Sequence, residues 1–284
     1  VPVFVSNSRG GFISDLTQKD FAIRDNNRAV EISYFASGTE RVGVVFALDA
    51  SGSAREIAQQ QAEAALSLLS QFGDRSRFAC LRFADRPELV LPFTTQRNQV
   101  HQAFSFLALR NRRTAIFDAA LTAVRLYDSD EARTQTERRI VILFSDGLDT
   151  ASSTNFSTVI EAATKRGVSF YVLHLPVFAP LGGRLAPRPA VKGFRKLAEE
   201  TGGRFFVIGD PEAALNPHAK PLLAPVFDAI AQDLRSQYML GYYSHDDQAG
   251  HHSIDVNLVT SKRRRLRVNV LRKAYDINEE PTVK

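Results

Sequence analysis

Both ends of the 284-residue chain alternate between hydrophobic and polar positions, which is the pattern of half-buried β-strands. The N-terminal end carries the runs VPVFVS, DFAIRD and AVEISYF, and the last two flank a turn at Asn26 and Asn27. The C-terminal end repeats the pattern in YMLGYY, HSIDVNLV and LRVNVLRKAY. Neither end has enough strands for a stable core of its own. We therefore expect both ends together to form one small β-sandwich.

The middle of the chain has a different pattern, in which continuous apolar runs alternate with stretches of helical spacing. Runs such as VGVVFALD and IVILFSD predict strands that are buried on both faces. The pattern predicts strands at 41–50, 76–84, 89–93, 138–146, 168–176 and 204–208. It predicts helices at 54–73, 97–107, 114–127, 157–167, 193–203 and 225–237. Alternating strands and helices indicate a mostly parallel sheet that helices cover on both sides.

Together these patterns predict an α/β fold with a doubly wound, mostly parallel sheet, inserted into a small β-sandwich. The sandwich comprises residues 1–40 and 237–275, the inserted domain spans 41–236, and 276–284 form a C-terminal tail. Insertion is tolerated where the two ends of the host domain lie close together. Residues 176–189 are rich in proline and glycine, and we expect a long loop there.

Composition narrows the classes of function. Of all residues, 44% are hydrophobic and 24% are charged, as in soluble globular proteins. No apolar run reaches the roughly 18 to 20 residues that a membrane-spanning helix needs, so we expect no span in this chain. Cys80 is the single cysteine, which excludes an internal disulfide and a cysteine-based zinc site. The net charge is +5 and the densest basic run is Lys262–Arg267, which we interpret as a turn and a solvated strand face.

Two aspartates end predicted buried strands, Asp49 after VVFAL and Asp146 after IVILFS. Ligands of open α/β sheets bind beyond the carboxyl ends of the strands, where the strand order reverses. If the first and fourth strands of the domain flank that point, the two carboxylates lie side by side. Ser51 and Ser53 follow the first aspartate at alternate positions, and Thr114 lies at the start of a predicted helix, where a third segment should approach the same edge.

Two carboxylates and three hydroxyls are hard oxygen ligands, suited to Mg²⁺, with Mn²⁺ or Ca²⁺ as alternatives. Taken singly, Thr114 is more typical of a helix N-cap, and Ser51 or Ser53 of a cap or turn. The predicted metal set is nevertheless the whole group, because its members meet at one sheet edge. It comprises Asp49, Ser51, Ser53, Thr114 and Asp146.

The segments DASGS, RTAIFDA and SDGLD resemble, in order and spacing, the three loops of the metal-ion-dependent adhesion site of von Willebrand factor type A domains. The flanking LTQKDFAIRDN and YMLGYYS resemble the bacterial proteins related to that family, so the resemblance covers nearly the whole chain. Two arginines, Arg112 and Arg113, precede Thr114 where many relatives have small residues. This departure removes no ligand from the set.

The resemblance implies that Ser51 and Ser53 bind a divalent ion through their hydroxyls, and that Thr114, Asp49 and Asp146 hold it directly or through water. It also implies an open coordination position for an Asp or Glu carboxylate of a partner protein. The expected function is thus adhesion or assembly, without catalysis, small-molecule substrate or nucleic acid. The resemblance further suggests an extracytoplasmic or secreted location.

Three alternatives remain. The first is a structural scaffold whose metal site does not function. The second is an enzyme of the aspartyl-phosphate phosphatase type, but the position two residues after Asp49 holds Ser51, which cannot act as a general acid near neutral pH. The third is binding of nucleic acid through the basic run, which a steep salt dependence would support. No phosphate-binding glycine-rich loop and no recognisable catalytic triad is present in the sequence.

Overall fold

The computed structural model describes residues 1–8, 13–37, 41–52, 69, 72–104, 113–128, 137–176, 178–182, 184–209, 224–244, 250–259, 266–270 and 274–277. The chain divides into two compact units. One consists of Val1–Gly38 and Gln232–Lys284, and the other of Thr39–Ala231. The second unit therefore interrupts the first along the sequence, close to the predicted 41–236. We call them the sandwich unit and the α/β unit.

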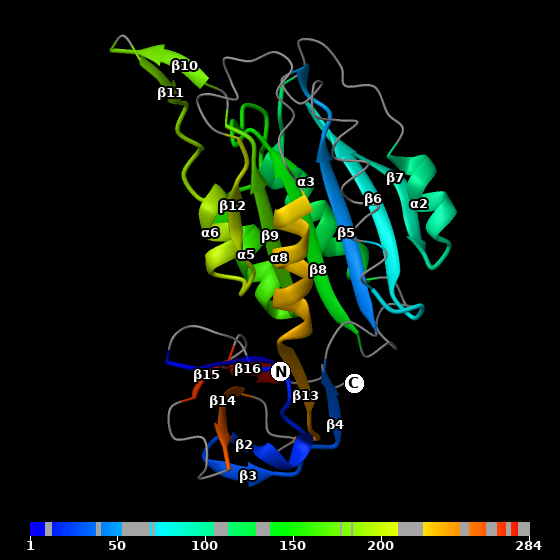
Figure 1. Cartoon of the computed structure of the whole chain (residues 1–284), viewed down its shortest axis with the longest axis vertical. Helices are drawn as coiled ribbons and strands as arrows, with labels where there is room; N and C mark the ends of the chain where they lie inside the picture. Colours follow the sequence, from blue (N-terminus) through cyan, green and yellow to red (C-terminus); the bar gives the residue numbers. More distant parts are fainter. Residues whose placement is uncertain are drawn as a thin grey trace, which may run out of the picture. The chain divides into compact units, whose positions relative to one another are not determined.

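A six-stranded sheet with the order β12-β9-β8-β5-β6-β7 forms the middle of the α/β unit (Figure 1). All neighbouring strands are parallel except β6 and β7, so the predicted fold class is confirmed. The order reverses between β5 and β8, the first and fourth strands of the unit. The strands are β5 (Val42–Asp49), β6 (Arg77–Phe83), β7 (Pro87–Thr94), β8 (Arg138–Ser145), β9 (Val168–His174) and β12 (Phe205–Val207).

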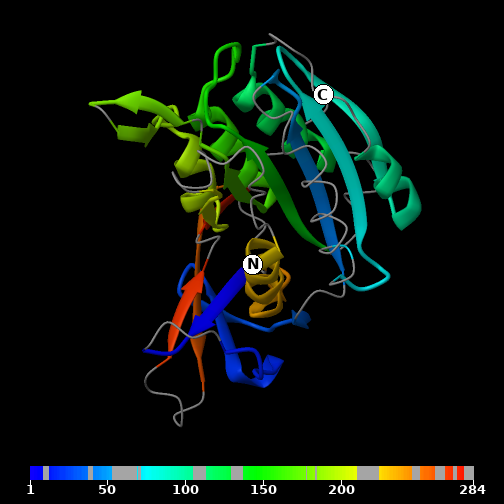
Figure 2. The same ribbon diagram turned by 45° about the horizontal axis from the view of Figure 1, so that its top comes forward.

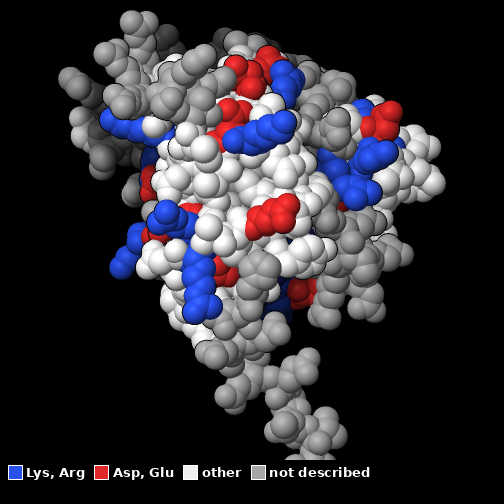
Figure 3. All heavy atoms as spheres, turned by 90° about the horizontal axis from the view of Figure 1, so that it is seen from below, with Lys and Arg blue, Asp and Glu red and all other residues white. Residues whose placement is uncertain are grey.

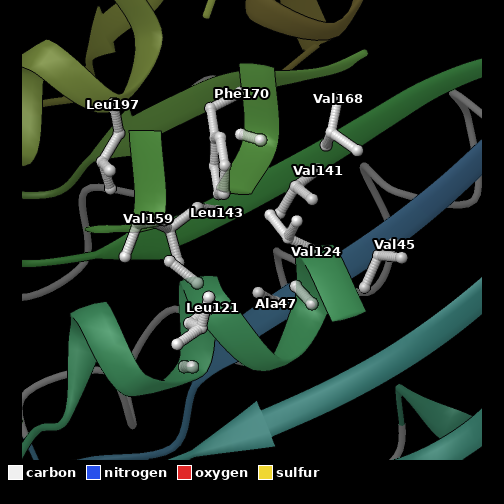
Figure 4. Packing of buried hydrophobic residues seen from close by; sticks show 14 of the residues in the cluster. Val45, Ala47, Leu121, Val124, Val141, Leu143, Val159, Val168, Phe170 and Leu197 are labelled. Carbon is white, nitrogen blue, oxygen red and sulfur yellow. The ribbon is translucent and has the colours of Figure 1, made fainter. Parts of the chain in front are cut away.

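Helices cover both faces of this sheet. On one face, side chains of α3, α5 and α6 pack against alternate residues of β5, β8 and β9, among them Val45 and Leu143 (Figure 4). On the other face, the rings of Phe144 and Phe227 lie 6.0 Å apart. All eight residues of β5 are buried, which explains its continuous apolar run. The helices are α2 (Arg97–Ala103), α3 (Ile116–Arg125), α5 (Phe156–Arg166), α6 (Phe194–Glu199) and α8 (Ala224–Arg235), with the 3₁₀ turn η3 (Leu126–Asp128).

The sandwich unit has two four-stranded antiparallel sheets, ordered β15-β1-β13-β4 and β16-β14-β2-β3. Their buried side chains, such as Val3, Ile23 and Val256, form one core. Asn26 and Asn27 take positive φ angles of 46° and 65°, as a tight two-residue hairpin turn requires. The elements are β1 (Pro2–Ser6), η1 (Gln18–Asp20), β2 (Phe21–Asp25), β3 (Arg28–Val30), β4 (Tyr34–Ser37), β13 (Gln237–Gly241), β14 (Gly250–Leu258), β15 (Arg267–Val270) and β16 (Ala274–Ile277).

The structure corrects the sequence-based expectations in two places. The expected loop at 176–189 contains an antiparallel hairpin of β10 (Phe178–Leu181) and β11 (Arg184–Pro187). Strand β16 reaches Ile277, where the sequence suggested a tail from 276. The predicted helix at 54–73 lies almost wholly outside the described residues. Among the helices that the structure describes, none has the length and apolar character needed to cross a membrane.

Candidate metal centre

Asp49 and Ser145 face each other at the ends of neighbouring parallel strands. In the ladder between β5 and β8, Leu48 pairs with Phe144, so the next residues of the two strands end at the same edge. The Ser145 Oγ donates a hydrogen bond of 2.7 Å to Asp49 Oδ2. Asp146 follows directly. The two aspartates therefore lie close together where the strand order reverses, which is the usual ligand position of such sheets.

The carboxylate of Asp49 is fully buried. Its Oδ1 accepts a 2.9 Å hydrogen bond from the backbone N–H of Ser51. The pKa of Asp49 is raised to about 6, mainly by burial, with a smaller contribution from the negative charge of Asp146. Hydrogen bonds from Ser51 and Ser145 act in the opposite direction. All of these offsetting donors are neutral, so a cation would stabilise the ionised carboxylate more than they do.

The loop of Asp146 is held from two sides. The Oδ1 of Asp146 accepts a 2.9 Å hydrogen bond from the N–H of Leu148. The backbone oxygen of Asp146 lies 3.0 Å from Nε2 of His174. Burial lowers the pKa of His174, which favours a neutral ring whose Nε2–H donates to that carbonyl. Gly147 has a φ of +77°, and an added Cβ would lie 2.7 Å from the Cβ of Ala190. This turn therefore requires glycine.

Thr114 joins the same group of loops through its backbone. Its carbonyl oxygen accepts hydrogen bonds from the N–H groups of Thr150 (2.8 Å) and Ala151 (3.1 Å), which follow Asp146 in the chain. The next residue, Ala115, donates to the carbonyl of Ala84, beyond the end of β6. Thr114 is 5% exposed. The third loop thus reaches the edge that carries the two aspartates.

The N-terminus of α3 is capped by the loop after β8. Ser152 Oγ accepts hydrogen bonds from the N–H groups of Phe117 (2.9 Å) and Asp118 (3.1 Å), and Asp149 Oδ2 accepts one from Phe117 (3.1 Å). The N-cap residue is Ala115, so the simpler interpretation of Thr114 as a side-chain cap is wrong. The capping hydroxyl comes from Ser152, more than thirty residues further along the chain.

The structure thus brings together Asp49, Ser51, Thr114 and Asp146, whereas Ser53 lies outside the described residues. Two carboxylates with nearby hydroxyls fit a hard divalent cation. The described residues contain no group of three or more His, Cys, Asp or Glu side chains that could hold a metal. A site here would therefore depend on hydroxyl ligands as well as on its two carboxylates.

Sequence reasoning missed the residues that support these loops, namely Ser145, Asp149, Ser152 and His174. A signal existed for Ser145 and Asp149, because both lie in the segment SDGLD, which carries part of the resemblance. His174 ends the buried strand β9 and packs against two aromatic rings, with its ring centroid 5.7 Å from those of both Phe194 and Phe205. Its role depends on contacts between distant segments, which the local pattern does not carry.

Fold and loops together define a doubly wound α/β domain with a polar centre at the carboxyl edge of its sheet. Residues 43–217 match the family model of the von Willebrand factor type A domain, and the chain belongs to this family. No curated protein matches the chain.

Solved structures with a similar fold include three of particular interest. The conserved hypothetical protein BatB from Bacteroides thetaiotaomicron is 18% identical, with a TM-score of 0.52 over 68% of this chain and 96% of its own. A von Willebrand factor type A structure from Catenulispora acidiphila is 18% identical, with a TM-score of 0.55 over 79% and 52%. Proximal thread matrix protein 1 from the mussel byssus, with a zinc-occupied MIDAS motif, is 15% identical, with a TM-score of 0.55 over 75% and 50%. At these identities the likeness concerns the fold.

The basic run Lys262–Arg267 is described only at Leu266 and Arg267, the second of which begins β15. Figure 3 shows one face of the molecule, on which described Lys and Arg side chains lie in separate groups, with Asp and Glu among them. Mixed charge of this kind does not favour a nucleic-acid surface on the described part of that face.

Proposed function

We propose that the chain is a metal-dependent protein-binding module that recognises an Asp or Glu carboxylate of a partner. Asp49, Ser51, Ser53, Thr114 and Asp146 would hold Mg²⁺, or Mn²⁺ or Ca²⁺ in its place. The observation that carries this proposal is the convergence of three loops at the carboxyl ends of β5 and β8, between which the strand order reverses. The raised pKa of Asp49 at this point adds to it. Membership of the von Willebrand factor type A family supports it.

The residues would have different tasks. Asp49 is fully buried and already accepts hydrogen bonds on both oxygens, so it would orient Ser51 and neutralise the ion from beneath. Asp146 is 8% exposed and lies closer to solvent. The hydroxyls of Ser51, Ser53 and Thr114 would bind without neutralising the ion. The bound ion would supply positive charge for a partner carboxylate.

No covalent turnover is expected. The side chains near the edge are hydrogen-bonded carboxylates and hydroxyls, and His174 donates to a backbone carbonyl of its own loop. We further propose, from the family resemblance alone, a location outside the cytoplasm. Fractionation of the native cells would test that point, and a purely cytoplasmic chain would contradict it.

A pull-down from native extract tests the binding function. Wild type should capture a partner in Mg²⁺ and release it when a chelator is added, whereas Asp146→Ala should capture nothing. Unfolding by urea, monitored by circular dichroism, should show that this variant keeps its fold, because Asp146 lies at a strand end and outside the apolar core. Capture that is equal with and without chelator would contradict the proposal.

One observation favours a structural scaffold as the second candidate. Hydrogen bonds between protein groups tie the loops to one another, from Ser145 to Asp49 and from Thr150 to Thr114. A scaffold would take up no Mg²⁺ at the concentrations that support partner capture. An Asp146→Ala variant that unfolds outright would also favour this candidate.

A further inference from the structure

The segment that follows β9 forms an arm beside the candidate metal centre. We define this basic arm as residues 176–193, which include the hairpin β10–β11 and the return to α6. Figures 1 and 2 both show the hairpin extending away from the sheet and helices of the α/β unit. Strands β10 and β11 pair only with each other among the described strands.

Both ends of the basic arm are fixed to the loop that carries Asp146. Just before the arm, the N–H of Leu175 donates 2.9 Å to the carbonyl of Ser145. Near its end, the N–H of Val191 donates 2.8 Å to the carbonyl of Gly147. Both of these hydrogen bonds therefore go to residues directly adjacent to Asp146. Any partner that reaches a metal held by Asp146 will lie close to the arm.

The charge of the basic arm has a single sign. Its sequence, PVFAPLGGRLAPRPAVKG, contains Arg184, Arg188 and Lys192 and no Asp or Glu. Arg188 and Lys192 are exposed, and neither makes an ion pair with another described residue. By contrast, Arg195 and Lys196 in α6 pair with glutamates one helical turn further on. The charges of Arg188 and Lys192 are thus available to a partner.

The distance from Arg188 to the loop of Asp146 determines which positions of a bound partner peptide the basic arm could contact. Arg188 lies three residues before Val191, so its Cα lies within about 11 Å of that of Val191, which is bonded to Gly147. An extended peptide covers the same distance in about three residues. At physiological salt, exposed charges more than about 8 Å apart are largely screened, so an acidic group of the partner must lie close to Arg188 or Lys192 to interact with it.

We propose that the basic arm is a second contact surface for the partner, and that it selects a protein segment with further acidic residues within about four positions of the metal-bound carboxylate. The inference rests on the proposed function, because it presumes a carboxylate at the metal. Complementary charge of this kind adds specificity and speeds association.

Two synthetic peptides of equal length test the proposal by fluorescence anisotropy in Mg²⁺. One carries a single central Asp among neutral residues, and the other adds four Glu at the third and fourth positions on either side. Wild type should bind the second peptide about tenfold more tightly. The variant Arg188→Glu/Lys192→Glu should lose this advantage while keeping the affinity for the single-acid peptide and for Mg²⁺.

Arg125→Glu/Lys165→Glu is the matched control, since it makes the same change of charge at the exposed C-terminal ends of α3 and α5. Equal behaviour of the arm variant and the control would overturn the proposal, as would equal affinity of wild type for the two peptides. A single-stranded oligonucleotide that binds the arm more tightly than the acidic peptide would overturn it in favour of nucleic acid.

Asp146→Ala separates failure of the inference from failure of the proposed function. Loss of both peptides in this variant, with loss of only the acidic advantage in the arm variant, supports both. Binding that survives Asp146→Ala but not the arm variant contradicts the metal-dependent function and leaves the arm as an acid-binding surface. If wild type binds neither peptide in Mg²⁺, both proposals are wrong.

Discussion

Asp49 is a buried acid that lies beside a second acid, and this makes the folded state sensitive to pH. Its pKa rises from an ordinary 3.8 to about 6 on folding. The folded state therefore holds a proton between these pH values that the unfolded state has lost. Consequently, the stability that the protonated Asp49 contributes to the metal-free protein is fully present below about pH 3.8 and is lost as the pH rises through about 6. The expected loss is about 3 kcal/mol, since one pKa unit is worth about 1.4 kcal/mol.

Urea unfolding in a chelator at several pH values measures this loss. Asp49→Asn should remove the dependence contributed by this residue, because an amide does not titrate. Added Mg²⁺ should also reduce it in wild type, since a cation favours the ionised form. A wild-type stability that follows the same pH curve as Asp49→Asn would show that Asp49 is not the responsible group.

For individual residues, the sequence predicted the two aspartates of the candidate metal centre but not the residues that hold its loops in place. Asp49 and Asp146 were predictable neighbours because each ends an apolar run, and parallel strands end at one edge. Ser152 was not predictable as the cap of α3, because the two are joined only by the folded loop. The metal ligation itself, including Ser53, stays a prediction.

In the loop of Asp146, the turn at Gly147 should tolerate substitution poorly. A Cβ added to Gly147 would lie 2.7 Å from the Cβ of Ala190. The backbone φ of Gly147 is +77°, a region that residues with a side chain rarely adopt. Gly167→Ala is a matched control, because its φ is +64° but nothing lies within 4 Å of an added Cβ. We expect a loss of roughly 1 kcal/mol for Gly167→Ala from backbone strain alone. Gly147→Ala should cost about 2 to 4 kcal/mol, since a steric clash adds to the strain.

Chemical denaturation of the two alanine variants and wild type measures the difference. Gly147→Ala should also weaken Mg²⁺ binding, because the clash moves the loop of Asp146, whereas Gly167→Ala should not. Equal losses of stability in the two variants would indicate that the loop around Gly147 moves freely out of the clash.

The hairpin β10–β11 shows why one element was missed. Its prolines, Pro180 and Pro187, and its central glycines are typical of a loop, and the run has no clear alternation. A two-stranded ladder tolerates them because each strand has a free edge, where a missing N–H breaks no bond. Phe178 nevertheless pairs with Pro187, and Pro180 with Leu185. The Pro and Gly residues of this segment indicate turns, but the sequence does not indicate that its two halves pair as strands.

The two units of the chain have separate cores, which predicts separate folding. Buried side chains of the α/β unit come from its sheet and helices, whereas those of the sandwich unit come from its own strands. A chain of residues 39–231 should therefore fold alone and keep a cooperative thermal transition. Circular dichroism and amide dispersion in NMR spectra measure this. A fragment without cooperative unfolding would show that the sandwich unit is needed for folding.

Pairing within the sandwich unit was predictable in kind but not in detail. Period-2 patterns at both termini predicted strands from both ends, and Val3 indeed pairs with Tyr238 on one side and Val270 on the other. The patterns did not say which strands are neighbours, because every strand offers the same alternation. Only the folded chain brings together residues that are more than two hundred positions apart.

The most direct test of the account is calorimetric titration of Mg²⁺ into the chelator-treated full chain and two variants. Wild type should bind one ion, and Asp146→Ala should lose at least tenfold in affinity, because removal of a carboxylate weakens a site with so few charged ligands. Asp85→Ala should bind like wild type, since this exposed acid follows β6 outside the proposed set. No uptake by wild type, or equal affinity in Asp146→Ala, would contradict a metal centre at this edge of the sheet.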